Sequence, residues 1–167
     1  MISVVIPAHN EEKTIGNCLE GLITQTIDKD RYEIIVVDDG STDNTPNIVN
    51  NFRGVRLIRQ KNQGPAAARN KGAEEARGEI ILFTDSDCIP FDNWIEEMIK
   101  PFDPNSEVVG VKGAYETKQR ELIARFVQIE YEDKYDKLKK QTNIDFIDTY
   151  AAGFRRNVFL QANGFNR

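Results

Sequence analysis

Two carboxylates one residue apart close an apolar run at residues 81–88, "ILFTDSDC". Side chains two positions apart on an extended chain project to the same side, so Asp85 and Asp87 are expected to converge. Convergent carboxylates repel each other unless one is protonated or a cation lies between them. Mg²⁺ or Mn²⁺ suits an all-oxygen site and typically completes its shell with phosphate oxygens. We therefore predict a metal site that carries a substrate's phosphates. The alternative is that one aspartate caps the next helix and the other is solvated.

A second acidic segment, "VVDDGSTDNT" at residues 36–45, follows another apolar run. An ionised aspartate only accepts hydrogen bonds, so it suits the imide N–H of uracil or thymine, or the N–H pair of guanine. We assign Asp39 to the base and place Asp38 nearer the ribose. Arg69 and Lys71 are candidates to meet diphosphate charge. The alternative is that they are solvated helix charges, which is favoured less for Arg69 because it follows three alanines. His9, the single histidine of the chain, is assigned no role.

Strands and helices alternate through the first half of the chain. Asn10 is expected to cap the first helix, and Gly78 to end the third. Apolar strands separated by helices indicate right-handed crossovers and a parallel sheet covered on both faces, with ligands beyond the carboxyl ends of the strands. The acidic segments therefore meet at one edge of an α/β sheet. The predicted strands are residues 2–7, 33–37, 55–59 and 79–84.

The second half has a weaker pattern, with no repeat and no linker, so a single domain is predicted. We expect a helix over 91–101, a strand over 108–115, a long amphipathic helix over 119–140, and a strand and turn over 146–154.

Composition excludes several classes of protein. The chain has 167 residues, of which 40 % are hydrophobic, enough for one core. The net charge of −5 argues against a nucleic-acid surface. No apolar run approaches the ~20 residues that span a bilayer, and no signal peptide is visible. Two cysteines are too few for a disulfide scaffold, and Cys18 is expected to be buried. A cytoplasmic chain is the resulting expectation.

Several segments together resemble the family-2 glycosyltransferases of the GT-A fold. Three cover most of residues 3–88 in the family's order, and a fourth, "AAGFRRNVFLQANGFNR", matches more loosely. The resemblance implies one GT-A (Rossmann-like) domain over 1–167, a three-layer sandwich with a mostly parallel central sheet. Residues 1–90 would be the nucleotide-sugar-binding half and 91–167 a partial acceptor half. The three closely matching segments are "VVIPAHNEEKTIGNCLEGLITQT", "EIIVVDDGSTDNT" and "NQGPAAARNKGAEEARGEIILFTDSDC".

For function, the resemblance implies transfer of a sugar from a UDP, GDP or dTDP sugar to a hydroxyl of a saccharide or lipid-linked acceptor. The transfer would invert the anomeric carbon, with Mn²⁺ or Mg²⁺ as cofactor and a carboxylate as base. By position, Pro7, Ala8 and Glu11 would contact the nucleoside, Asp39 the base, Asp85 the ribose and metal, and Asp87 the metal as its main ligand; Gly153, Arg155 and Arg156 would lie near the donor sugar and acceptor.

The sequence departs from the family at the carboxylate that acts as general base. In the family this carboxylate lies shortly after a segment whose counterpart here is "NGFNR" at 163–167. Asp145 and Asp148 are nearby, but neither matches the motif. We therefore expect a piece truncated at its C-terminus, with the base beyond Arg167 and with nucleotide binding but weak or no transfer. In the full-length protein this domain would lie in the cytoplasm at the inner face of the membrane.

Other functions remain open at this point. The chain would be a non-catalytic nucleotide-sugar-binding or assembly module if the helix at 119–140 serves a partner. A sugar nucleotidyltransferase or a dinucleotide-binding dehydrogenase is disfavoured, because both would show a glycine-rich loop after the first strand and "PAHNEE" at 7–12 has no glycine.

Overall fold

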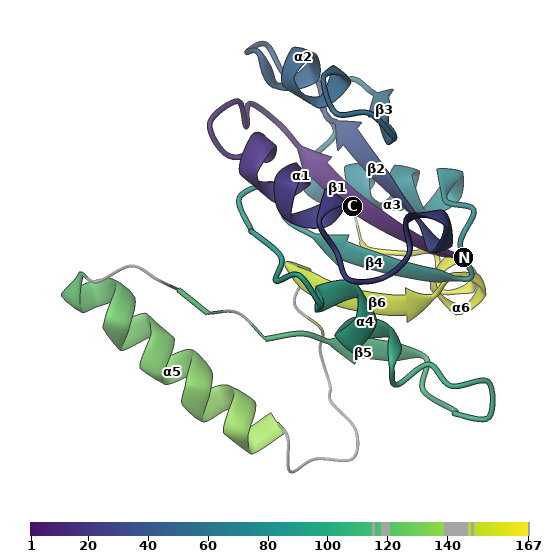
Figure 1. Cartoon of the computed structure of the whole chain (residues 1–167), viewed down its shortest axis with the longest axis vertical. Helices are drawn as coiled ribbons and strands as arrows, with labels where there is room; N and C mark the ends of the chain where they lie inside the picture. Colours follow the sequence, from purple (N-terminus) through teal and green to yellow (C-terminus); the bar gives the residue numbers. More distant parts are fainter. Residues whose placement is uncertain (115, 118–120, 139–146, 148, 167) are drawn as a thin grey trace.

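A computed structural model of the chain describes residues 1–114, 116–117, 121–138, 147 and 149–166 (Figure 1). Strands and helices alternate up to residue 84, as the apolar periodicity predicts. The elements are β1 (Ile2–Ala8), α1 (Ile15–Ile23), η1 (Lys29–Arg31), β2 (Tyr32–Asp38), α2 (Thr45–Asn50), β3 (Val55–Arg59), α3 (Pro65–Glu75), β4 (Ile80–Thr84), α4 (Trp94–Ile99), β5 (Gly110–Lys112), α5 (Leu122–Leu138), β6 (Ala151–Arg155) and α6 (Arg156–Gln161).

The six strands form one sheet in the order β3-β2-β1-β4-β6-β5. Strands β3, β2, β1 and β4 run parallel to one another, whereas β6 runs antiparallel to both β4 and β5. The predicted mostly parallel central sheet is therefore confirmed. The carboxyl ends of β1, β2, β3 and β4 lie at one edge, where the acidic segments begin.

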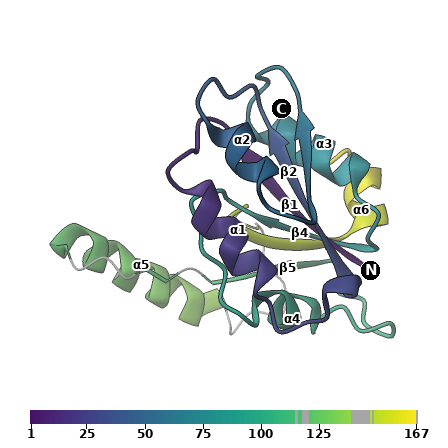
Figure 2. The same cartoon turned by 45° about the horizontal axis from the view of Figure 1, so that its top comes forward.

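Helices cover both faces of the sheet and make three layers, as Figure 2 shows for α1 and α4 on one face and α3 and α6 on the other. Alternate residues of β1 serve the two faces: Val4 and Ile6 pack in the cluster with α1, and Val5 packs in the cluster with α3. All three are fully buried. A central parallel strand buried on both faces explains why its sequence is a continuous apolar run.

Helix α3 packs on the sheet at close range. A Cβ atom added to Gly72 would overlap Val5 Cγ1 and lie 3.2 Å from Val37 Cγ2. Ala68 and Ala73 of the same helix are fully buried. The small residues of "PAAARNKGA" thus allow a close approach that larger side chains would prevent.

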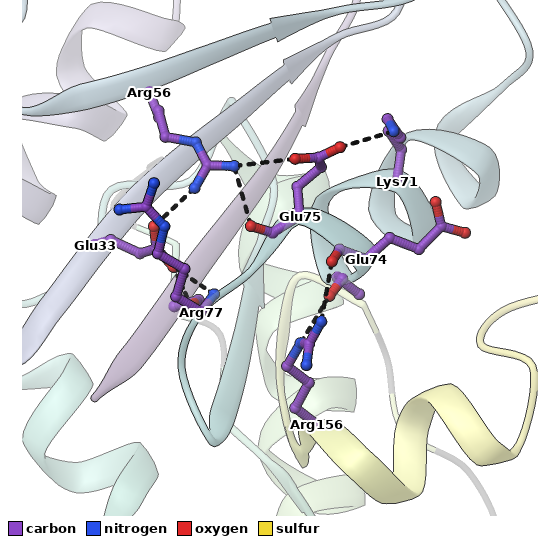
Figure 3. Close-up of polar contacts among 9 residues, drawn as sticks. Glu33, Arg56, Lys71, Glu74, Glu75, Arg77 and Arg156 are labelled. Atoms are coloured by element: carbon purple, nitrogen blue, oxygen red, sulfur yellow. Dashed lines mark hydrogen bonds and ion pairs between the residues drawn. The ribbon is translucent and has the colours of Figure 1, made fainter.

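A polar network ties the strands together at the opposite edge (Figure 3). The Glu33 carboxylate accepts hydrogen bonds from Ser3 Oγ at 2.7 Å, from the Arg77 amide at 2.7 Å and from Arg56 Nη1 at 3.1 Å. The Gly78 amide donates to Ser3 Oγ at 2.9 Å. This network joins β1, β2, β3 and the loop between α3 and β4, and it fixes the end of the sheet away from the acidic segments.

Two predicted helix boundaries are wrong. Helix α1 begins at Ile15 rather than directly after Asn10, which has a φ of 57° and whose Oδ1 accepts the Thr42 amide at 2.8 Å. Asn10 is therefore part of the turn that meets the segment after β2. Helix α3 ends at Glu75, before Gly78, because the chain must already turn there to enter β4.

The second half differs more from the prediction. Strand β5 has three residues, and β6 begins at Ala151, after the predicted start at 146. Residues 118–120 and 139–146, where parts of the long helix and last strand were predicted, lie outside the described residues, as do Asp145 and Asp148. Helix α5 projects away from the sheet, on the side of β5 and β6, in both views (Figures 1 and 2). None of the described helices combines the length and the apolar character needed to cross a membrane.

Candidate functional site

A cavity of about 380 Å³ opens beyond the carboxyl ends of β1, β2 and β4. This volume falls in the range of small-molecule sites, and its position is where open α/β sheets bind ligands. The cavity brings together four segments of the chain, residues 7–11, the start of the turn after β2, residues 62–69 and residues 85–87. Its lining residues are Pro7, Ala8, His9, Glu11, Asp39, Asn62, Gly64, Pro65, Arg69, Asp85, Ser86 and Asp87.

Asp39 directly follows β2 and is buried, with 3 % of its surface exposed. Its Oδ1 accepts Gln60 Nε2 at 2.7 Å and the Gln63 amide at 2.9 Å. Its Oδ2 accepts the Gly64 amide at 2.8 Å. Gly64 has a φ of 90°, a conformation that glycine adopts without strain. The carboxylate is thus held rigidly at the cavity wall as a hydrogen-bond acceptor.

Asp38 lies elsewhere, although it was expected near the ribose. The residue is fully buried and does not line the cavity. Its Oδ1 accepts the Ser41 amide at 3.1 Å, and its Oδ2 accepts Arg59 Nε at 2.9 Å. Neighbouring side chains at a strand end point in opposite directions, so Asp38 and Asp39 cannot both face the ligand. In this structure Asp38 holds the turn after β2 and the end of β3.

The Asp85 carboxylate already has one cationic partner. Arg69 Nη2, from α3, donates to Asp85 Oδ1; the side chain of Arg69 is 9 % exposed and that of Asp85 is 32 % exposed. Arg69 Nε is buried and has no hydrogen-bond partner among the described residues. Arg69 therefore offsets the negative charge of one of the two carboxylates.

Asp87 is exposed and lines the same cavity as Asp85, while Ser86 between them is buried but also lines it. The described residues contain no group of three or more His, Cys, Asp and Glu side chains that could hold a metal by themselves. Two carboxylates nevertheless fit Mg²⁺ or Mn²⁺, because these ions commonly take one or two protein carboxylates and complete their shell with phosphate oxygens and water. The donor set therefore fits a metal that is bound together with a phosphorylated ligand.

The two cysteines lie beside the acidic loop as free thiols. Cys18, from α1, is fully buried, and its Sγ donates to the Asp85 carbonyl at 3.6 Å, which confirms the predicted burial. Burial, together with the negative charges nearby, raises the pKa of Cys18 to about 12. Burial followed by the charges of Asp87 and Asp85 raises the pKa of Cys88 to about 12 as well. Both thiols are therefore neutral at physiological pH, and Cys18 packs under the loop.

Pro7, Ala8 and Glu11 form the side of the cavity that follows β1. The Ala8 carbonyl accepts the Asp39 amide at 2.8 Å, which joins this side to Asp39. The Glu11 amide donates to Thr45 Oγ1 at 2.7 Å, and Glu11 Oε2 accepts Thr14 Oγ1 at 2.6 Å. The three residues expected at the nucleoside therefore do reach the cavity.

Several lining residues had been assigned no role from the sequence. His9 Nδ1 donates to the Asp39 carbonyl at 2.9 Å, and Asn62 Nδ2 lies 3.3 Å from His9 Nε2. His9 directly follows β1, and this position at the carboxyl end of a strand could have indicated that it lines the cavity. Asn62 and Pro65 belong to a loop whose direction only the tertiary structure shows.

Gly153, Arg155 and Arg156 are not brought to this cavity. Strand β6 runs antiparallel to β4, so Arg155 pairs with Ile80 at the far end of β4 and only Ala151 reaches Thr84. These three residues, which were expected near the donor sugar, therefore do not line the cavity in this structure.

The two arginines instead bind backbone carbonyls. Arg155 donates from Nε to Val108 at 2.9 Å and from Nη2 to Ser106 at 3.0 Å. Arg156 donates to Ala73 at 3.1 Å and to Glu74 at 3.0 Å, at the end of α3 (Figure 3). Both guanidinium groups therefore hold β6 and α6 in place.

Comparisons with known proteins agree on one family. The family described as Glycosyl transferase family 2 matches residues 3–161. Glycosyltransferase AglE of Haloferax volcanii is 42 % identical over 100 residues, which are 57 % of this chain and 33 % of AglE. Glycosyltransferase GlyG of Streptococcus pneumoniae is 44 % identical over 103 residues, or 59 % of this chain and 34 % of GlyG. The matched region thus spans about a third of the length of these relatives.

Solved structures agree on the fold. The mannosyltransferase PcManGT from Pyrobaculum calidifontis, in complex with GDP-Man and Mn²⁺, matches with a TM-score of 0.81 and 25 % identity over 99 % of this chain and 47 % of that chain. TarS 1-349 of S. aureus in complex with UDP-GlcNAc matches with a TM-score of 0.71 over 97 % of this chain and 47 % of that chain. At 23 % identity, TarS shows the fold alone.

Proposed function

The chain belongs to glycosyl transferase family 2, and from this premise we propose that its cavity binds a nucleoside diphosphate sugar together with a divalent metal ion, for transfer of the sugar to an acceptor hydroxyl. The observation that carries the proposal is the convergence of Asp39, Arg69, Asp85 and Asp87 on one cavity from three separate segments of the chain.

In this proposal Asp39 accepts a hydrogen bond from the base, and Pro7, Ala8 and Glu11 surround the nucleoside. Arg69 supports the diphosphate. Its Nε is buried without a partner in the described part of the chain, and such a donor costs roughly 1–3 kcal/mol. A phosphate oxygen reached by a small movement of the guanidinium group would relieve that cost and bring a cation to the diphosphate charge.

Asp85 and Asp87 would hold Mn²⁺ or Mg²⁺ in this site. The Mn²⁺ present with GDP-Man in PcManGT supports that assignment. A bound divalent ion supplies charge neutralisation at the departing diphosphate, acting as a Lewis acid and a template. Arg69 keeps the Asp85 carboxylate oriented, and Asp87, being exposed, can reach a ligand in the cavity.

The transfer step is proposed as a single displacement with inversion at the anomeric carbon. A second cavity of about 510 Å³ shares Asp87 with the first and is lined on its other sides by residues such as Trp94 and Tyr150. We assign this second cavity to a saccharide or lipid-linked acceptor. The acceptor hydroxyl needs a carboxylate as general base. The carboxylates that line the first cavity are already assigned to the nucleotide or to the metal ion in this proposal. We therefore propose that the general base is a carboxylate that does not line the first cavity.

Titration calorimetry with UDP, GDP and dTDP, with and without Mn²⁺, tests the binding part. Tight binding should require Mn²⁺ and should be lost in Asp87→Asn, which removes one ligand charge without changing the side-chain shape. Asp30→Asn, at an exposed site in η1, is the matched control and should bind normally. Metal-independent binding, or none, would contradict the proposal.

A second measurement separates an enzyme from a binding module. Release of the nucleoside diphosphate from its sugar donor is followed in the presence of candidate acceptors. Metal-dependent release above the rate of Asp87→Asn supports transfer. Tight metal-dependent binding without release would favour a non-catalytic module.

A further inference from the structure

Gln60, the first residue after β3, sets how many hydrogen bonds the Asp39 carboxylate can still accept. Gln60 Nε2 and the Gln63 amide both donate to Asp39 Oδ1, at 2.7 and 2.9 Å. A carboxylate oxygen has two lone pairs, so these two donors fill Oδ1. The Gly64 amide takes one position on Oδ2, at 2.8 Å. With these donors in place, Asp39 has one acceptor position left for a ligand.

Nucleotide bases differ in the number of donors that they would present there. Uracil and thymine have a single ring N–H, flanked by carbonyl groups. Guanine presents a ring N–H and an adjacent amino group, and it would use both oxygens of a free carboxylate. At a buried carboxylate, an N–H group without an acceptor also loses its contact with water, and this loss is costly. Guanine therefore has one donor too many for this site.

We propose that Gln60 is a specificity-determining residue that restricts the donor to a nucleotide whose base presents one ring N–H, namely a uridine or thymidine diphosphate sugar, and that it disfavours guanosine diphosphate sugars. The inference rests on the proposed function, because it places the base against Asp39. Gln60 does not line the cavity, so it acts through Asp39 rather than by touching the base.

Inosine diphosphate separates this explanation from simple size exclusion. Its base has the ring system of guanine and one ring N–H but lacks the amino group. Titrations of the chain with UDP, IDP and GDP at saturating Mn²⁺ should therefore give tighter binding of IDP than of GDP, by on the order of 10-fold or more. A pocket that rejects purines by size would instead weaken IDP and GDP equally.

Gln60→Met tests the residue itself. Methionine has a similar length but no amide donor, so Oδ1 regains one acceptor position and the ratio of IDP to GDP affinity should fall toward one. Gln63→Met is the matched control, because Gln63 binds Asp39 through its backbone amide, which the substitution keeps. Because the IDP and GDP affinities are compared on the same variant, changes in folding or in metal affinity cancel in their ratio.

The titrations distinguish failure of the proposed function from failure of the role of Gln60. If no nucleoside diphosphate binds with Mn²⁺, the proposed function fails and this inference fails with it. If nucleotides bind but GDP equals or exceeds IDP in the unaltered chain, the proposed function stands and the role of Gln60 is overturned. If the ratio favours IDP but Gln60→Met leaves it unchanged, the assignment to Gln60 is overturned as well.

Discussion

Arg69 on α3 donates a hydrogen bond to Asp85, the first residue after β4, and so joins a buried cation to one carboxylate of the predicted metal site. The contact places the positive charge of a helix residue at the carboxyl edge of the sheet. It also fixes one oxygen of Asp85, which leaves the other for a ligand.

Replacing Arg69 should weaken nucleotide binding. Arg69→Met keeps the bulk of the side chain but removes its donors, and hydrogen bonds to charged groups contribute roughly 1.5–3 kcal/mol each. We expect the Kd of UDP at saturating Mn²⁺ to rise by about 10- to 100-fold. Calorimetry measures this directly. Lys71→Ala is the control: Lys71 lies on the same helix but pairs with Glu75 outside the cavity. Equal loss in both variants would show that α3, rather than Arg69, is responsible.

Two helical glycines should respond in opposite ways to the same substitution. Gly72→Ala on α3 places a methyl group against Val5 and Val37, and overpacking of this kind costs about 1–3 kcal/mol. The methyl group of Gly16→Ala on α1 would lie 4.0 Å from Ile48 Cγ2, at ordinary contact distance. This substitution should stabilise the fold by up to about 1 kcal/mol because alanine is the better helix former. Urea unfolding of both variants tests the pair. A stabilising Gly72→Ala would contradict the close packing of α3 on the sheet.

Ser3 should matter for stability but not for ligand binding. Its side chain is buried at the edge opposite the cavity and accepts the buried Gly78 amide while donating to Glu33. Ser3→Ala leaves that amide without a partner, and the free energy of unfolding should fall by about 1–3 kcal/mol. Ser3→Cys retains a weaker donor and acceptor and should lose less. A UDP affinity that fell along with stability would show that the two edges of the sheet are coupled.

The first half of the fold could be predicted because its signals are local. Continuous apolar runs marked strands buried on both faces, and turn-forming acidic segments marked their carboxyl ends. The parallel sheet then brought Asp39, Asp85 and Asp87 to one cavity without further information. The convergence of the site therefore followed from the alternation of elements.

The features that could not be predicted depend on the direction of a strand or side chain relative to distant parts of the chain. The antiparallel course of β6, which takes Arg155 and Arg156 away from the cavity, has no signature in the local sequence pattern. Asp38 and Asp39 are adjacent and identical in type, so only the pleat decides which one faces the ligand. Gln60 is ordinary in sequence and gains its role from a contact with a residue 21 positions earlier.

The two thiols beside the acidic loop should react slowly with alkylating reagents. Because burial raises the pKa of Cys18 and Cys88 to about 12, their thiolate fraction at pH 8 is about 10⁻⁴, roughly 10³-fold below that of an ordinary thiol. Iodoacetamide labelling of the metal-free protein in EDTA should therefore be very slow and should accelerate about tenfold per pH unit. The same protein in urea is the control and should label rapidly. Fast labelling at pH 8 without denaturant would contradict the raised pKa values.

The same shift predicts a loss of stability at alkaline pH. A thiol whose pKa is raised on folding contributes fully below its unfolded pKa and loses that contribution as the pH rises toward the folded value. For Cys18, whose pKa rises from 9.0 to about 12, the window is pH 9 to 12, and the slope is at most about 1.4 kcal/mol per pH unit. Urea unfolding of the unaltered chain and of Cys18→Val at pH 8, 9, 10 and 11 measures it. Cys18→Val should show the shallower decline above pH 9, and parallel curves would mean that other groups control the alkaline limit.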